Sequence, residues 1–225
     1  MDKTLEEMQL AQWLLLLSTR LIDNDCAFLA LLREQLNQRG IDAFLADIAV
    51  PLSRLVGEWW EENKMSVFME HAYTVQMTQV LNDYILEAVL DDQTRCLSDV
   101  PRIVLASFLG EKHVLGLTMT QALLLEKGAY CLNLGAELPV RSIIEAAKQY
   151  RADIVGLTVS TTFNQRMAIA LIKELRQTLP DTTEIWVGGN GATRLASLAA
   201  ITILNDVTSS VEAYQALAKR KQNRT

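Results

Sequence analysis

The sequence predicts an N-terminal four-helix bundle followed by a doubly wound parallel sheet of five strands, an α plus α/β fold. Glycine usage is the first observation, because only Gly40 and Gly57 of the 10 glycines precede Gly110. The second observation is the apolar pattern, which has helical spacing in the first half and alternates continuous apolar runs with helical segments in the second. Few glycines are typical of a bundle, whereas apolar runs joined by helices are typical of a parallel sheet covered on both faces.

Four helices are expected in the first half, at about residues 5–21, 26–40, 41–62 and 67–90. The second follows the capping-type residues of segment 23–25 and ends near Gly40. Pro51 lies inside the third, so we expect a kink or a break there. Ser66 is placed to cap the fourth.

A polar segment, residues 91–101, ends in proline and is expected to link two domains, residues 1–94 and 101–225. Buried strands are predicted at residues 102–107, 129–134, 153–159 and 184–189, with a weaker fifth at 201–204. Helices are expected after them, ending near residue 128, starting at 139, covering 165–179 and lying near 211–219. Right-handed crossovers then give a doubly wound sheet, whose ligands bind beyond the carboxyl ends of the strands.

Composition narrows the class of protein. The net charge of −6 gives no reason to expect binding to nucleic acid or to an acidic membrane. The three cysteines, Cys26, Cys96 and Cys131, form no C-x-x-C pair, so we expect buried thiols in a reducing cytosol rather than a disulfide framework or a zinc site. The apolar run 14–17 is too short to span a bilayer. The basic C-terminus, residues 218–225, is expected to be a solvated helix end whose cations are favoured by the helix dipole. The protein is therefore expected to be soluble and cytoplasmic.

His113 is one of only 2 histidines, and it lies on a glycine-bounded turn after the first predicted strand. Glu111 is close enough in sequence to hold one nitrogen of the imidazole and leave the other for a metal or a proton. Gly116 would let a bulky group approach the start of the following helix. The alternative is a loop histidine that caps the helix or faces water.

Two further groups lie at the same predicted edge of the sheet. Thr158 and Ser160 belong to a run of hydroxyls that ends a buried strand, where they could simply satisfy loose backbone groups. Gly188 and Gly189, with Gly191 close behind, form either a tight turn or a place where the backbone comes close to a flat ligand.

Taken together, Glu-x-His-x-x-Gly, the hydroxyl run and the glycine pair resemble the cobalamin-binding domain family, whose pattern is Asp-x-His-x-x-Gly, Ser-x-Leu and Gly-Gly. The resemblance covers about residues 101–225 and implies a Rossmann-like cobalamin-binding fold. It implies that His113 coordinates cobalt from below in place of the cofactor's own benzimidazole, and that the nucleotide tail passes Thr158 and the glycine pair. Glu111 stands where aspartate is commoner, Thr158 where serine is usual, and Ser160 where leucine is usual.

His71 shares a helical face with apolar neighbours, and a lone histidine on such a face is usually a core residue. Yet Trp60, followed by Glu70 and His71, resembles the helical cap of cobalamin-dependent light-sensing regulators of the CarH/LitR type. The resemblance implies that these three residues lie next to the upper axial group of adenosylcobalamin. Where some members carry a second cobalt-reaching histidine, directly after the tryptophan, this chain has Glu61.

The resemblance implies a cobalamin-binding sensor, light-responsive and not an enzyme, that changes its pairing with copies of itself or with a transcription regulator. Adenosylcobalamin is the expected form of the cofactor, and methylcobalamin is the alternative form. Many such regulators carry a MerR-type helix-turn-helix before the bundle, for which the preceding residues are too few. Either that domain was removed or the chain is a stand-alone sensor, with no nucleic-acid contact of its own and no membrane partner.

Three rival functions stay open at this point. A corrinoid shuttle subunit of a methyltransferase has the same two-part layout and would need an open upper face. A small mutase subunit would not need the bundle. The site could also hold haem, or no cofactor at all.

Overall fold

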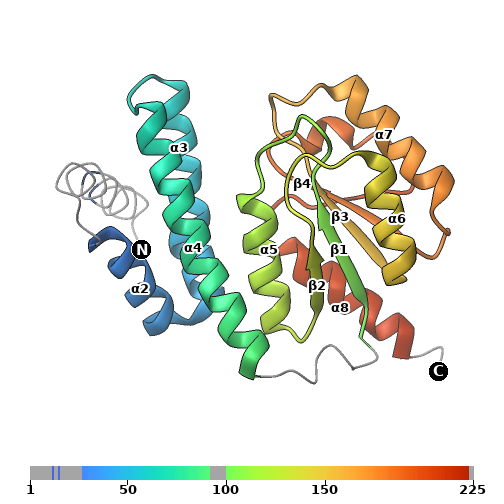
Figure 1. Ribbon diagram of the computed structural model, residues 1–225, viewed down its shortest axis with the longest axis horizontal. Helices are drawn as coiled ribbons and strands as arrows, with labels where there is room; N and C mark the ends of the chain where they lie inside the picture. Colours follow the sequence, from blue (N-terminus) through green and yellow to red (C-terminus); the bar gives the residue numbers. More distant parts are fainter. Residues whose placement is uncertain (1–11, 13–14, 16–26, 92–99, 223–225) are drawn as a thin grey trace. The chain divides into compact units, whose positions relative to one another are not determined.

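The computed structural model describes Gln12, Leu15 and residues 27–91 and 100–222. The chain divides into two compact units, Met1–Tyr84 and Ile85–Thr225 (Figure 1). The helix expected at residues 5–21 lies almost entirely outside the described residues, and so does most of the expected linker. The predicted domain limits, residues 1–94 and 101–225, therefore stay a prediction.

The first unit is helical, as the sequence predicts. It contains α2 (Ala27–Phe44), a π-helical turn (Leu45–Ala49), α3 (Val50–Glu61) and most of α4 (Val67–Asp91). The end predicted near Gly40 appears as a kink, since Gly40 has φ 74° and ψ 166°. The break predicted at Pro51 is displaced to the π-helical turn before it. Pro51 lies in the first turn of α3, where its missing N–H removes no hydrogen bond from the helix.

A buried aromatic pair and a hydroxyl pair hold these helices together. Phe28 of α2 and Tyr73 of α4 pack with ring centroids 6.4 Å apart. The Tyr73 hydroxyl lies 2.7 Å from the Ser53 hydroxyl of α3, and Ser53 donates to the carbonyl of Ala49 at 2.6 Å. The polar groups of the π-helical turn are thus partly satisfied by side chains that also join α3 to α4.

The second unit is a five-stranded parallel sheet, which confirms the predicted fold class. Its strands are β1 (Arg102–Ala106), β2 (Tyr130–Asn133), β3 (Ile154–Thr158), β4 (Glu184–Gly188) and β5 (Thr202–Ile203). They lie in the order β2-β1-β3-β4-β5, and every neighbouring pair is parallel. This strand order is that of the flavodoxin-like doubly wound sheets.

Helices cover both faces of this sheet (Figure 1). Ile103 and Leu105 of β1 pack with residues of α5 (Leu115–Glu126) and α8 (Ser209–Gln222). The alternate β1 residues pack with α6 (Val140–Tyr150) and α7 (Gln165–Thr178) on the opposite face. Because both faces are buried, the strands read as continuous apolar runs rather than as alternating ones.

The adjacent strands β1 and β3 form the switch point of the sheet. The chain leaves β1 toward β2 on one side, and it leaves β3 toward β4 on the other. The loops after these two strands therefore diverge, and in open α/β sheets the crevice between such loops is where ligands bind.

The basic end of α8 is largely exposed, as the sequence predicts, and two of its cations also form ion pairs. Arg220 Nη2 lies 2.6 Å from Glu184 Oε1, and Lys221 Nζ lies 2.9 Å from Asp153 Oδ1. Glu184 also accepts from Trp186 Nε1 at 2.9 Å. These ion pairs join α8 to the amino-terminal edge of the sheet. Across the described residues, no helix combines the length and hydrophobicity that crossing a membrane requires.

The first prediction concerns Gly156, in the middle of β3. A Cβ at this position would lie 2.6 Å from Cδ2 of Leu105, which is fully buried and cannot move aside freely. We expect Gly156→Ala to lower the free energy of unfolding of the second unit by about 1–3 kcal/mol through overpacking. Native-state hydrogen exchange of the strand amides measures this. Gly116→Ala is the matched control, since its Cβ would meet nothing within 4 Å; equal effects of the two substitutions would contradict the overpacking explanation.

Candidate functional site

The turn after β1 is fixed by hydrogen bonds to its own backbone and to the turn after β2. The buried Ser107 hydroxyl donates to the carbonyl of Glu111 at 2.6 Å and accepts from the Glu137 N–H at 3.0 Å. The Glu111 N–H donates to the carbonyl of Phe108 at 2.8 Å. The position of residue 111 is therefore determined by contacts from both sides of the turn.

The Glu111 side chain is 1% exposed and accepts three hydrogen bonds. Its Oε1 accepts from the backbone N–H of His113 at 3.0 Å and lies 2.7 Å from Nδ1 of the same residue. Its Oε2 accepts from the backbone N–H of Ser160, after β3, at 2.7 Å. One carboxylate thus joins the ends of the two strands that form the switch point.

These contacts keep Glu111 ionised despite its burial. Burial alone would raise the pKa of this carboxyl, because it disfavours the charged form. Hydrogen bonds from His113 and Ser160 outweigh that effect and lower the pKa from 4.5 to about 2. The buried group is therefore a carboxylate across the physiological pH range.

His113 is held by Glu111 through one ring nitrogen, and most of its side chain is exposed. Its side chain is 68% exposed, while Nδ1 is fixed by the buried carboxylate. The neutral tautomer that donates its Nδ1 proton to Glu111 carries its lone pair on Nε2, the atom that a metal ion would bind. Of the alternative interpretation, a loop histidine that caps the helix or faces water, the first part is wrong, because the N-cap of α5 is Val114 and has no side-chain cap hydrogen bond. The second part agrees with the 68% exposure of the His113 side chain.

The hydroxyl residues at the end of β3 and just after it differ in exposure and contacts. Thr158, the last residue of β3, is buried. The Ser160 hydroxyl lies 2.9 Å from the Thr162 hydroxyl, so it bonds a neighbouring side chain rather than a loose backbone group. The backbone N–H of Ser160, and not its side chain, makes the contact with Glu111.

At the end of β4, two of the three glycines leave room for the backbone of the turn after β3. Gly189 has φ 93°, and a Cβ there would lie 2.6 Å from the carbonyl oxygen of Val159. A Cβ at Gly191 would lie 2.3 Å from the carbonyl oxygen of Ser160. Gly188 is less crowded, since its nearest neighbour would be Leu204 Cβ at 3.8 Å. The close approach expected for a flat ligand is thus made, at two of these glycines, by the backbone of the turn after β3.

Gly116, by contrast, borders open space. A Cβ at this position would meet nothing within 4 Å. It lies in the first turn of α5, near the exposed imidazole of His113 in the chain. The start of α5 is therefore accessible to a bulky ligand, as the sequence pattern indicates.

Trp60, Glu70 and His71 belong to the first unit. Trp60, at the end of α3, is 44% exposed, and the His71 side chain is 73% exposed. Glu70 accepts from the Thr74 hydroxyl at 3.0 Å and lies 3.7 Å from His71 Nε2. The interpretation of His71 as a core histidine is wrong, because the buried face of α4 carries Tyr73 instead.

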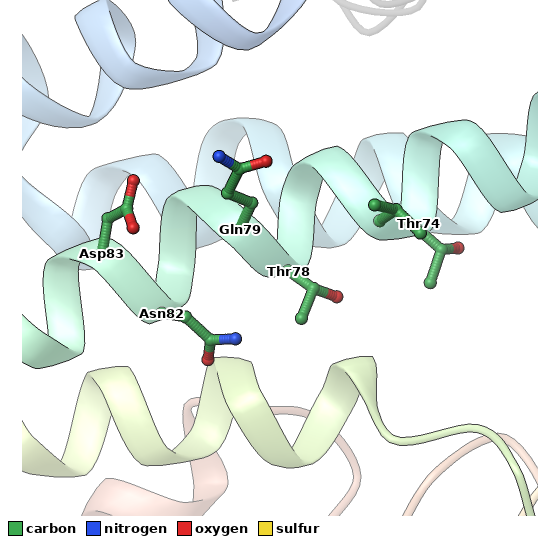
Figure 2. Close-up of a pocket in the computed structure, with 6 residues that line it drawn as sticks. Thr74, Thr78, Gln79, Asn82 and Asp83 are labelled. Carbon is green, nitrogen blue, oxygen red and sulfur yellow. The ribbon is translucent and has the colours of Figure 1, made fainter.

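A shallow hollow lies along α4, beyond His71. It is lined by Thr74, Val75, Thr78, Gln79, Asn82 and Asp83. Thr74, Thr78 and Asn82 follow one another at helical spacing along one side of α4 (Figure 2). The outward face of α4 therefore mixes hydroxyl and amide groups with exposed apolar side chains.

Arg194 is a member of the site that the sequence analysis missed. It lies in the 3₁₀-helix Ala192–Leu195, and its Nη2 donates to the carbonyl of Ser160 at 2.9 Å and to that of Phe163 at 3.4 Å. Its partners are backbone atoms, which leave no signature in the sequence. Ser160 is thus held from both sides, by Glu111 at its N–H and by Arg194 at its carbonyl.

The fold and the site define a doubly wound α/β domain that presents an oriented imidazole at its switch point. The B12 binding domain family matches residues 101–218. This chain belongs to that family, and its cofactor is cobalamin.

Two curated relatives carry different names. The HTH-type transcriptional repressor CarH of Myxococcus xanthus is 30% identical over 146 residues, which cover 65% of this chain and 46% of the repressor. The dimethylamine corrinoid protein 2 of Methanosarcina acetivorans is 28% identical over 142 residues, which cover 62% of this chain and 63% of that protein. The chain thus spans about half to two thirds of these relatives.

A solved structure shares the fold. The monomethylamine corrinoid protein of Methanosarcina barkeri superposes with a TM-score of 0.64 at 14% identity, covering 82% of this chain and 87% of that one. At this identity the likeness concerns the fold alone.

The residues present fit cobalamin. A neutral imidazole is a suitable ligand for cobalt, and the His113 side chain is 68% exposed. The open space at Gly116 leaves room for such a ligand at the start of α5. The carboxylate that fixes the Nδ1 side is the usual second partner of a metal-binding histidine.

The second prediction follows from the lowered pKa of Glu111. A carboxyl whose pKa is lowered by folding stabilises the native state above its unfolded value of 4.5, and this contribution is lost as the pH falls through about 2. We expect the stability difference between wild type and Glu111→Gln to shrink by about 3 kcal/mol between pH 7 and pH 2. Urea titrations followed by amide signals of the sheet measure it. Glu174→Gln, at an exposed position of α7, is the control variant, and an equal change in both variants would contradict this explanation.

Proposed function

We propose that this chain is a cobalamin-dependent sensor in transcriptional control, in which His113 is the lower axial ligand of cobalt. The observation that carries this proposal is the pair formed by the buried Glu111 carboxylate and the exposed His113 imidazole, 2.7 Å apart. The cofactor would bind with its own benzimidazole displaced by this imidazole.

Each candidate site residue of the second unit has a defined part in this proposal. Glu111 fixes the tautomer and raises the basicity of the ligand histidine. Gly116 leaves the start of α5 open, and Thr158, Ser160, Gly188 and Gly189 line the edge along which the nucleotide tail would pass. Bound adenosylcobalamin supplies a cobalt–carbon bond that light can break.

The first unit is proposed to cover the upper axial group. Trp60 and His71 are both exposed, so neither side chain is committed to the core of the first unit. Glu70 is held by Thr74, so its carboxylate is already positioned. Adenosylcobalamin, rather than methylcobalamin, is the form that such a cover would accommodate.

Signalling is proposed to run through the bundle. A ligand biases a two-state protein only by binding one state better than the other. The upper axial group would favour the state in which the bundle covers it, and loss of that group would remove this bias. The changed surface would then alter pairing with copies of this chain or with a transcription regulator. The likeness to a transcriptional repressor supports this, and the proposal assigns no catalytic step, no nucleic-acid contact and no membrane contact to the chain, which would act in the cytoplasm.

A corrinoid shuttle for a methyltransferase is the second candidate. It is favoured by the dimethylamine corrinoid proteins among the relatives, which match this chain nearly as well as the repressor does. A shuttle would have to open its upper face to a partner enzyme, and it would carry methylcobalamin. The two candidates share the lower site and differ in what the first unit does.

The third prediction tests the lower ligand. We expect His113→Ala to bind adenosylcobalamin at least about tenfold more weakly, and to lose the absorption bands of histidine-ligated cobalt, because no other imidazole of the second unit can replace it. Absorption spectra across a cobalamin titration measure both effects. His71→Ala, which removes the other histidine, should keep those bands; a His113→Ala protein with unchanged affinity and colour would refute the proposed ligation.

The fourth prediction separates sensor from shuttle. We expect protein loaded with adenosylcobalamin to change its spectrum irreversibly under green light and to change its oligomeric state or its pairing with a regulator. Spectroscopy and light scattering before and after illumination measure this. Indifference to light, together with methyl transfer from methylcobalamin-loaded protein to an acceptor, would reject the sensor and support the shuttle.

A further inference from the structure

We infer that Arg194 is a positioning residue for His113, acting through the backbone of Ser160 and the buried carboxylate of Glu111. This inference deepens the proposed function and rests on it for the role of His113. Its geometry, however, concerns only the protein's own atoms.

The contacts form a continuous chain across three strand ends. Arg194, after β4, donates through Nη2 to the carbonyl oxygen of Ser160 at 2.9 Å. Ser160, after β3, donates its N–H to Glu111 Oε2 at 2.7 Å. Glu111, after β1, contacts His113 Nδ1 through its other oxygen at 2.7 Å.

Arg194 is suited to holding a loop rather than a ligand. Its guanidinium also donates to the carbonyl of Phe163 at 3.4 Å, so one planar group spans the turn that begins at Ser160. Its own carbonyl accepts from Gln165 Nε2, in the first turn of α7, at 2.7 Å. A forked, permanently charged donor can bind several carbonyls at once, which a lysine ammonium does with poorer geometry.

Gly191 makes this contact sterically feasible. A Cβ there would lie 2.3 Å from the Ser160 carbonyl oxygen and 2.8 Å from Arg194 Nη2. Any larger residue would push apart the two groups that the hydrogen bond joins. Arg194 and Gly191 therefore constrain the same carbonyl by two independent means, attraction and the absence of a side chain.

The consequence is that the turn after β4 sets the orientation of the imidazole after β1. The Ser160 carbonyl belongs to the peptide group after residue 160 and the Ser160 N–H to the one before it, so the two contacts hold residue 160 from both sides. If Arg194 releases the carbonyl, residue 160 can shift, and its N–H is less well aligned with Glu111 Oε2. The Glu111 side chain is then less firmly oriented, and so is its contact with His113 Nδ1. The population of the His113 tautomer with its proton on Nδ1 is the quantity that reports this.

The experiment measures the tautomer of His113 by long-range proton–nitrogen NMR in untagged, cobalamin-free protein. All variants carry His71→Gln, so that His113 is the sole imidazole. We expect Arg194→Gln to lower the ratio of the Nδ1-protonated to the Nε2-protonated form by about threefold to tenfold. Arg194→Lys should retain part of this ratio, and Gly191→Ala should lower it as Arg194→Gln does.

Arg220→Gln is the matched control. Arg220 is another ion-paired arginine of the same unit, but it lies at the opposite edge of the sheet on Glu184. It should leave the tautomer ratio unchanged, and thermal unfolding followed by circular dichroism shows whether each variant is folded. An unchanged ratio in folded Arg194→Gln or in folded Gly191→Ala overturns the inference, as does an equal change in Arg220→Gln.

The same variants are then titrated with adenosylcobalamin. We expect Arg194→Gln to bind about threefold to tenfold more weakly than Arg220→Gln, since partners behind a metal ligand affect affinity through it. If His113→Ala binds as well as wild type, the proposed ligation fails, and yet the tautomer ratio still decides the role of Arg194. If the ratio is unchanged while His113→Ala abolishes binding, the inference alone fails.

Discussion

The site depends on one buried charge, the carboxylate of Glu111. Removing an ionised group from water is costly unless donors replace the lost hydration, and here three N–H groups do so. They come from two different strand ends, so the charge is satisfied only when β1 and β3 lie side by side with their turns correctly placed. The stability of the sheet and the orientation of His113 are thus consequences of the same hydrogen bonds. This explains how an exposed imidazole on a turn can have a fixed direction.

The parallel sheet supplies the remaining constraint. Strands β1 and β3 pair in register from Ile103 with Ile154 to Ala106 with Leu157, which brings the turns that follow them to the same height. Beyond that point β3 continues beside β4, and Thr158 pairs with Gly188. The turn after β4 can then reach the carbonyls of the turn after β3, because Gly189 and Gly191 carry no side chain to prevent it. The turns after β1, β3 and β4 are therefore coupled, although only the turn after β1 carries the imidazole of His113.

The sequence predicts the elements of this site better than it predicts their contacts. The apolar runs predict all five strands. For the central strands β1, β3 and β4 the reason is burial on both faces, which favours continuous apolar sequence. The edge strands β2 and β5 are less buried, and the run that predicts β5 is the weaker one. The pairing of Glu111 with His113 is predictable from a spacing of two residues within one turn. The N–H of Ser160 is not, since a backbone donor has no residue signature, and Arg194 binds carbonyls 34 and 31 residues away. In the first unit, helical periodicity places His71 on a face of α4 but cannot say whether that face is covered, and the structure leaves its side chain exposed.

The division of labour between the two units decides which function the protein serves. In our proposal a sensor and a shuttle use His113 in the same way, so the second unit does not distinguish them. We therefore propose that the distinction lies in the first unit, where Trp60 is exposed at the end of α3 and Glu70 accepts from the Thr74 hydroxyl. A side chain that is held before a ligand arrives loses little entropy on binding, so Glu70 is suited to contact the proposed upper group. For this reason we place the proposed switch in the bundle and treat the lower site as its fixed support.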